Sequence, residues 1–181
     1  MDDRCRTKLN DDAKLLFVIL GDSYANALTT IFDALAVVSQ EFSRYIKIGR
    51  ELCPLVSGIG DTKYQALTET AIFFTAEPTG SKYVVLAGQW SLHINRNSLD
   101  AQIERSIQGL EQTITTLQQA GNQVVFTHTM PLGVLPRTRT ARIPGKISGD
   151  CSILSQTMFE RENGYKSLVS GVLEKFGVKG V

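Results

Sequence analysis

Residues 15–25 read LLFVILGDSYA, an uninterrupted apolar run that stops at Gly21 and passes at once into polar residues. The run is rich in branched aliphatic residues and shows no alternation of apolar with polar, which is typical of a strand buried on both faces of a parallel sheet. The next apolar residues are spaced three and four apart, as on one face of an amphipathic helix: Leu28, Ile31, Phe32, Leu35 and Val38. Residues 15–38 therefore predict a buried strand followed immediately by a helix.

The rest of the chain repeats this alternation. Short apolar runs predict further strands over residues 44–48, 83–87 and 123–127. Helical spacing predicts helices over residues 64–74 and 99–117, and a last helix that ends at Phe176. Strands that alternate with helices form βαβ units around a parallel sheet. We therefore expect an α/β fold, a flavodoxin-like three-layer α/β/α sandwich with a mostly parallel sheet.

The two ends of the chain bound the expected domain. Residues 1–13 lack the alternation and are expected to form an N-terminal extension, with the domain itself over residues 14–181. A helix closed by a glycine is followed by a strand elsewhere in this chain, yet after Gly177 only residues 178–181, VKGV, remain. We therefore expect a C-terminally incomplete domain, with the sheet truncated before its fifth strand.

Composition excludes several classes of protein. Nineteen basic and eighteen acidic residues give a net charge of +1, too small for a general nucleic-acid binder, which needs a basic face for phosphates. The longest apolar run has six residues, whereas a membrane span needs about 20, so no span is expected. Cys5, Cys53 and Cys151 fit no zinc spacing, and no metal site is expected. Whether these cysteines are free thiols or pair in a disulfide stays open.

Gly21-Asp22-Ser23 is the candidate catalytic segment. Open α/β sheets bind ligands outside the carboxyl ends of their strands, near the point where the strand order reverses. A serine at that place presents its hydroxyl at the mouth of the sheet, and the following helix offers backbone N–H groups to an oxyanion. Asp22 and Ser23 are also favoured helix N-caps, so a purely structural role for this segment stays open.

The Gly-Asp-Ser segment resembles the first block of the SGNH, or GDSL-like, hydrolases. More narrowly, the chain looks like the SGNH domain fused to membrane acyltransferases of the acyltransferase-3 family, over roughly residues 14–181. The stretches that carry this narrower resemblance are Cys53-Pro54-Leu55, residues 84–91 (VVLAGQWS), residues 124–126 with Pro131, and Cys151.

The resemblance assigns roles to individual residues. Ser23 would be the acyl-accepting nucleophile, with its own N–H as one oxyanion donor, and Asp22 would shape the turn. Gly49 is the nearest match to the glycine of the second block, with Gly58 and Gly60 as rivals. Gln89 stands near the place of the asparagine that the third block normally supplies, so its amide is a weak substitute for that oxyanion donor.

The catalytic base of the family has no counterpart by motif. SGNH enzymes supply it from an Asp-x-x-His block, and no such pair occurs in residues 1–181. His93 and His128 follow the third and fourth expected strands but match no family block. We expect both to be satisfied histidines at the rim of the sheet.

Three more residues are candidate substrate contacts. Arg137 and Arg139 lie in a proline- and glycine-rich segment, residues 132–150, where they would contact an anionic glycan or simply face solvent. Trp90 would be either a stacking platform for a sugar or a packed core residue.

The resemblance implies a serine-dependent O-acyltransferase or acyl esterase that acts on cell-surface polysaccharide, with O-acetyl transfer as the expected reaction. Its expected partners are a glycan acceptor, an acyl donor and a membrane acyltransferase domain, its expected location is periplasmic or extracytoplasmic, and no cofactor is implied. The alternative is a catalytically inactive glycan-binding or accessory module of the same fold. An unrelated flavodoxin-like domain is the third interpretation.

Overall fold

The computed structural model describes residues 5–8, 16–39, 44–49, 55–59, 62–77, 82–94, 100–128 and 151–181. The strands in this part of the chain are β1 (Cys5–Lys8), β2 (Phe17–Gly21), β3 (Tyr45–Gly49), β4 (Tyr83–Ala87), β5 (Gln123–Thr127) and β6 (Lys179–Gly180). The helices are α1 (Ser23–Val38), α2 (Thr62–Ala76), α3 (Trp90–His93), α4 (Asp100–Gln119) and α5 (Cys151–Phe176). The predicted alternation of strands and helices is confirmed.

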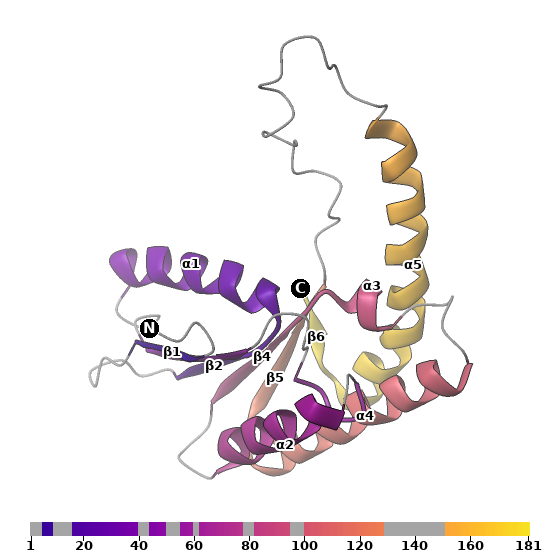
Figure 1. The fold of residues 1–181 in the computed structure, drawn as a ribbon. Helices are drawn as coiled ribbons and strands as arrows, with labels where there is room; N and C mark the ends of the chain where they lie inside the picture. Colours follow the sequence, from indigo (N-terminus) through magenta and orange to yellow (C-terminus); the bar gives the residue numbers. More distant parts are fainter. Residues whose placement is uncertain are drawn as a thin grey trace, which may run out of the picture.

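The strands form a single sheet in the order β1-β3-β2-β4-β5-β6 (Figure 1). All neighbours are parallel except β1, which runs antiparallel to β3. The five parallel strands follow the flavodoxin-like order. The chain first adds β3 on one side of β2 and then crosses to the other side of β2 to add β4, β5 and β6. The strand order therefore reverses between β2 and β4. The α/β fold class is therefore confirmed.

The ends of the sheet differ from the expectation. Lys179–Gly180 pairs with β5 as a fifth parallel strand, so the expectation that the sheet stops before that strand is wrong. The backbone explains this, because a strand needs only ladder hydrogen bonds: the N–H of His128 donates to the oxygen of Val181, and the N–H of Val181 to that of Phe126. At the other edge, Cys5–Lys8 of the expected N-terminal extension joins the sheet as β1.

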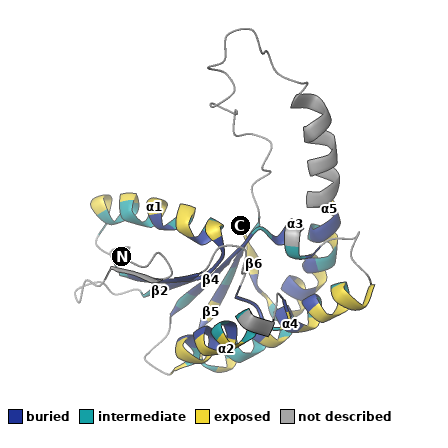
Figure 2. Cartoon of the chain, viewed as in Figure 1, coloured by how far each residue is buried: buried dark blue, intermediate teal, exposed yellow. Residues whose placement is uncertain are grey.

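Helices cover the two faces of the sheet unequally. In Figure 1, α1 lies alone on one face, whereas α2, α4 and α5 lie on the other. The larger hydrophobic cluster lies between the sheet and these three helices, with residues such as Leu86, Ile114 and Val169. A smaller cluster, which includes Ile19 and Ala25, lies under α1. Figure 2 shows the same contrast, with buried strands between helices whose outer sides are exposed.

The register places the carboxyl ends of the parallel strands side by side. Gly21 of β2 is paired with Gly49 of β3 and with Ala87 of β4, and Ala87 is paired with Thr127 of β5. Whatever follows these residues therefore gathers at one edge of the sheet. Asp22, Ser23, Gln89 and His128 all follow them.

Candidate active site

The Gly-Asp-Ser segment lies where the strand order reverses. Gly21 ends β2, Asp22 is the N-cap of α1, and Ser23 is the first residue of that helix. Ser23 is exposed, and its hydroxyl makes no hydrogen bond among the described residues. The positive end of the α1 macrodipole is suited to a developing negative charge on an oxygen bound there.

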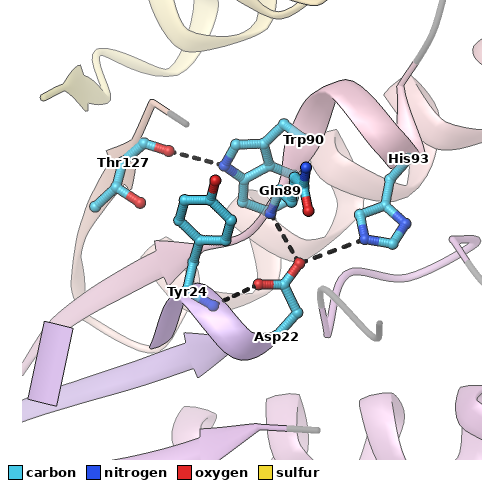
Figure 3. Close-up of polar contacts among 6 residues, drawn as sticks. All are labelled: Asp22, Tyr24, Gln89, Trp90, His93 and Thr127. Carbon is cyan, nitrogen blue, oxygen red and sulfur yellow. Dashed lines mark hydrogen bonds and ion pairs between the residues drawn. The ribbon is translucent and has the colours of Figure 1, made fainter. Parts of the chain in front are cut away.

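Asp22 is a buried carboxylate that ties two elements together (Figure 3). Its side chain is 2% exposed. Oδ1 accepts the N–H of Tyr24 at 2.9 Å, and this bond caps α1. Oδ2 accepts the N–H of Gln89 at 2.8 Å, from the segment that follows β4. The capping role that the sequence left open for either residue therefore falls to Asp22, and Ser23 is left outside it.

His93 is the residue of this site that the sequence did not predict. Its Nε2 atom lies 3.5 Å from Oδ2 of Asp22, and its side chain is 13% exposed (Figure 3). Nε2 is buried and has no hydrogen-bond partner among the described residues. His93 ends α3, one helical turn after Gln89, and this spacing is the only sequence signal that would have placed it beside the same carboxylate.

The glycine candidates separate in the structure. Gly49 lies beside Gly21, so close that a Cβ on it would overlap the carbonyl oxygen of Gly21. Gly58 has a positive φ of 71° and packs against the backbone of α4 at Arg105 and Gly109. Gly60 lies outside the described residues. Of the described pair, only Gly49 stands next to the Gly-Asp-Ser turn.

Trp90 lies in the core of the domain. It is 0% exposed, its ring stacks on Phe126 with centroids 4.5 Å apart, and its Nε1–H donates to the oxygen of Thr127 at 2.8 Å. A sugar ring has no access to a face that is already covered, so the expected role as a stacking platform is wrong. The packed-core alternative is the one observed. Gln89, directly before it, has a half-buried side chain at the N-cap of α3.

His128 lies apart from Asp22, at the end of β5, two strands away from β2. Its Nδ1 atom is 3.5 Å from the hydroxyl of Tyr165, and its ring is edge-on to Phe126. Burial, with the charge of Lys166 as a second cause, lowers the pKa of His128 below its usual value.

Several expected features fall outside what the structure describes. Arg137, Arg139 and Cys53 lie in undescribed segments, and Cys5 and Cys151 lie in elements whose side chains are not described there. In the described ranges no three His, Cys, Asp or Glu side chains are grouped to hold a metal ion. No described helix has the length and apolarity of a membrane span.

A family model described as "SGNH domain (fused to AT3 domains)" matches residues 1–177. No curated protein matches the sequence.

Solved structures share the fold. The periplasmic domain of a Salmonella ser. Paratyphi A lipopolysaccharide acetyltransferase matches with a TM-score of 0.61 at 17% identity, over 95% of this chain and 67% of that one. The psychrotrophic esterase EstA from Pseudoalteromonas sp. matches with 0.52 at 12% identity, over 92% and 75%. A variant of an acetyl-xylooligosaccharide esterase from Geobacillus matches with 0.55 at 8% identity, over 93% and 76%.

Proposed function

The chain belongs to the family of SGNH domains fused to AT3, or acyltransferase-3, domains, and on that premise we propose that it performs Ser23-dependent acyl transfer to a hydroxyl of a cell-surface polysaccharide. Acetyl is the proposed acyl group. The observation that carries the proposal is the exposed Ser23 at the strand-order reversal, next to an Asp22 that already caps the helix. This geometry keeps the hydroxyl available for chemistry.

The proposed reaction has two steps. The Oγ of Ser23 attacks the carbonyl carbon of an acyl ester, the alcohol of the donor leaves, and a serine ester remains. A sugar hydroxyl then attacks this ester, releases Ser23 and carries the acyl group away; water in its place would give hydrolysis. The N–H of Ser23, with Gly49 and Gln89 beside it, is proposed to stabilise the tetrahedral oxyanions. Residues 1–181 contain no Asp-x-x-His pair, and the proposal assigns the base to no described group.

The substrate and location rest on the comparisons. The family is one whose SGNH domains are fused to AT3 domains, which supports a membrane acyltransferase domain as partner and the periplasmic or extracytoplasmic side as location. One structural neighbour is the periplasmic domain of a lipopolysaccharide acetyltransferase, which supports a polysaccharide acceptor. Arg137 and Arg139 are proposed to contact anionic groups of that acceptor.

The test compares Ser23→Ala with Ser170→Ala, an exposed serine on α5. Turnover of p-nitrophenyl acetate and transfer of acetyl to polysaccharide should fall by about 10³-fold or more in Ser23→Ala and stay unchanged in Ser170→Ala. Mass spectrometry should find one acetyl group on the peptide that contains Ser23. Full turnover by Ser23→Ala would show that Ser23 is not the nucleophile.

A non-catalytic glycan-binding module is the second candidate. It is favoured by the third block, where Gln89 stands near the place of the asparagine that the family normally supplies. This candidate predicts no turnover by the wild type, together with polysaccharide binding that is equal in wild type and Ser23→Ala by calorimetry.

A further inference from the structure

Asp22 and His93 face each other from elements far apart in the sequence. Asp22 stands in the turn between β2 and α1, and His93 stands at the end of α3. Both side chains are largely buried, at 2% and 13% exposed, and Oδ2 of Asp22 is 3.5 Å from Nε2 of His93. A buried carboxylate and a buried imidazole nitrogen each need a polar partner. Asp22 already accepts the N–H groups of Tyr24 and Gln89, whereas Nε2 of His93 has no hydrogen-bond partner among the described residues and has Oδ2 of Asp22 as its polar neighbour.

The helix that carries His93 depends on contacts of this kind. α3 has only four residues, and one helical turn is not stable by its own hydrogen bonds. Two polar contacts hold its first residues: the N–H of Gln89 donates to Asp22, and the indole N–H of Trp90 donates to Thr127. His93 is the third, and it returns to the same oxygen of Asp22 that Gln89 uses.

We propose that His93 is a positioning residue for the reaction of Ser23. An N–H on its Nε2 atom faces Oδ2 of Asp22, and through this carboxylate it holds Gln89 in place beside the nucleophile turn. Nε2 of His93 faces Asp22, so His93 acts on the site through Asp22. This inference rests on the proposed function, because Ser23 as nucleophile and Gln89 as oxyanion donor belong to it.

The first part of the test measures the fluorescence of Trp90 and does not depend on catalytic activity. Trp90 is the only tryptophan of the chain and lies in the same short helix, so its fluorescence reports on how α3 packs against β5. In the full chain, His93→Leu removes the N–H donor and should increase quenching of Trp90 by acrylamide. His93→Gln keeps an N–H donor near the position of Nε2 and should leave quenching near the wild-type value. Asp33→Asn, on α1 and bonded to Tyr45, is the matched control that should change nothing.

The second arm measures turnover of p-nitrophenyl acetate. His93→Leu should lower kcat by about 10- to 100-fold with little change in KM, and His93→Gln should restore most of that loss. If His93 acts through Asp22, the double variant His93→Leu/Asp22→Asn should lose no more than the worse single variant.

Each remaining outcome overturns the inference or separates it from the proposed function. Wild-type kcat and quenching in His93→Leu would overturn it. A loss as large as that of Ser23→Ala, with no rescue by His93→Gln and unchanged quenching, would make His93 the base and also overturn it. Full turnover by Ser23→Ala would contradict the proposed function alone. The quenching of Trp90 would still show whether His93 holds α3 through Asp22.

Discussion

Asp22 uses both of its carboxylate oxygens, which an ordinary helix cap does not. One oxygen caps α1 at Tyr24, a contact of the kind worth about 0.5–2 kcal/mol. The other crosses to the N–H of Gln89. Leaving such a buried N–H unpaired costs about 1–3 kcal/mol. Asp22, the residue before Ser23, therefore fixes the ends of β2 and β4 against each other, and the geometry around Ser23 depends on it.

Gly21 provides the residue-scale test of this close packing. A Cβ on Gly21 would overlap the carbonyl oxygen of Ala87 in the neighbouring strand, and backbone of a central strand cannot move aside cheaply. We expect Gly21→Ala to lower the free energy of unfolding by about 3 kcal/mol, measured by urea titration. Gly171→Ala is the control: nothing lies within 4 Å of its added Cβ on α5, and it should stabilise by about 0.5–1 kcal/mol. Equal urea midpoints for Gly21→Ala and wild type would contradict the packing described.

Single residues were predictable where the chain pattern itself places them. Asp22 and Ser23 follow a buried apolar run, and Gly49 ends the next strand, so strand ends alone locate all three. His93 and Trp90 were not predictable in this way. Their surroundings depend on how the single turn of α3 is rotated against β5 and Asp22, and this rotation is set by tertiary contacts that no local pattern encodes.

At the scale of elements, β5, α5 and β6 meet around His128. Tyr165 of α5 is fully buried and approaches Nδ1 of His128, and Phe126 of β5 lies against the ring. Burial first, and the neighbouring charge of Lys166 second, lower the pKa of His128 from its ordinary 6.5. The folded chain thus binds this proton more weakly than the unfolded chain does.

The sign of the resulting pH dependence follows from linkage. A histidine with a lowered pKa contributes stability that is fully present above its unfolded pKa of 6.5 and is lost as pH falls through 6.5 toward the folded pKa. We therefore expect the free energy of unfolding to fall as pH decreases from about 7.5 to 5, and this fall to be smaller in His128→Gln. Lys166→Gln, which removes the second cause, should give an intermediate slope. Identical urea-unfolding profiles for wild type and His128→Gln would contradict it.

The sequence predicted which segments are strands and which are helices better than it predicted how many strands the sheet has. The strands at 83–87 and 123–127 have the predicted bounds, because continuous branched apolar runs mark them clearly. β1 and β6 were missed, because edge strands need only backbone partners and have no apolar signature. β6 has two residues, both exposed.

At the scale of the whole molecule, the two sides of the sheet contribute differently. The larger cluster joins the sheet to α2, α4 and α5, and of the helices that the structure describes only α1 covers the smaller one. α1 exposes large apolar side chains at Ile31, Val37 and Val38. Most of the apolar burial, and with it most of the stabilisation, therefore lies on the face away from α1. This asymmetry was not predictable from the sequence, because every helix has an apolar stripe whichever face it covers.

The central strands should be the last part of the molecule to open. β2 and β4 each lie between two parallel neighbours, and residues such as Ile19, Leu20 and Leu86 are 0% exposed. β6 is a two-residue edge strand. In native-state hydrogen exchange, the amides of β2 and β4 should exchange only through global unfolding, whereas that of Val181, which donates to the oxygen of Phe126, should exchange through local opening that costs at least ~3 kcal/mol less.

The same experiment bears on the site, because Asp22 and Ser23 continue directly from β2. If β2 is among the last strands to open, Ser23, the proposed nucleophile, keeps its orientation while the edges of the sheet open and close. Urea at low concentration should therefore leave the exchange of the β2 amides unchanged and accelerate it only near the unfolding transition. Exchange of the β2 amides as fast as that of Val181 would show that the Gly-Asp-Ser turn stands on a mobile strand, and the site would then not be held rigidly by β2.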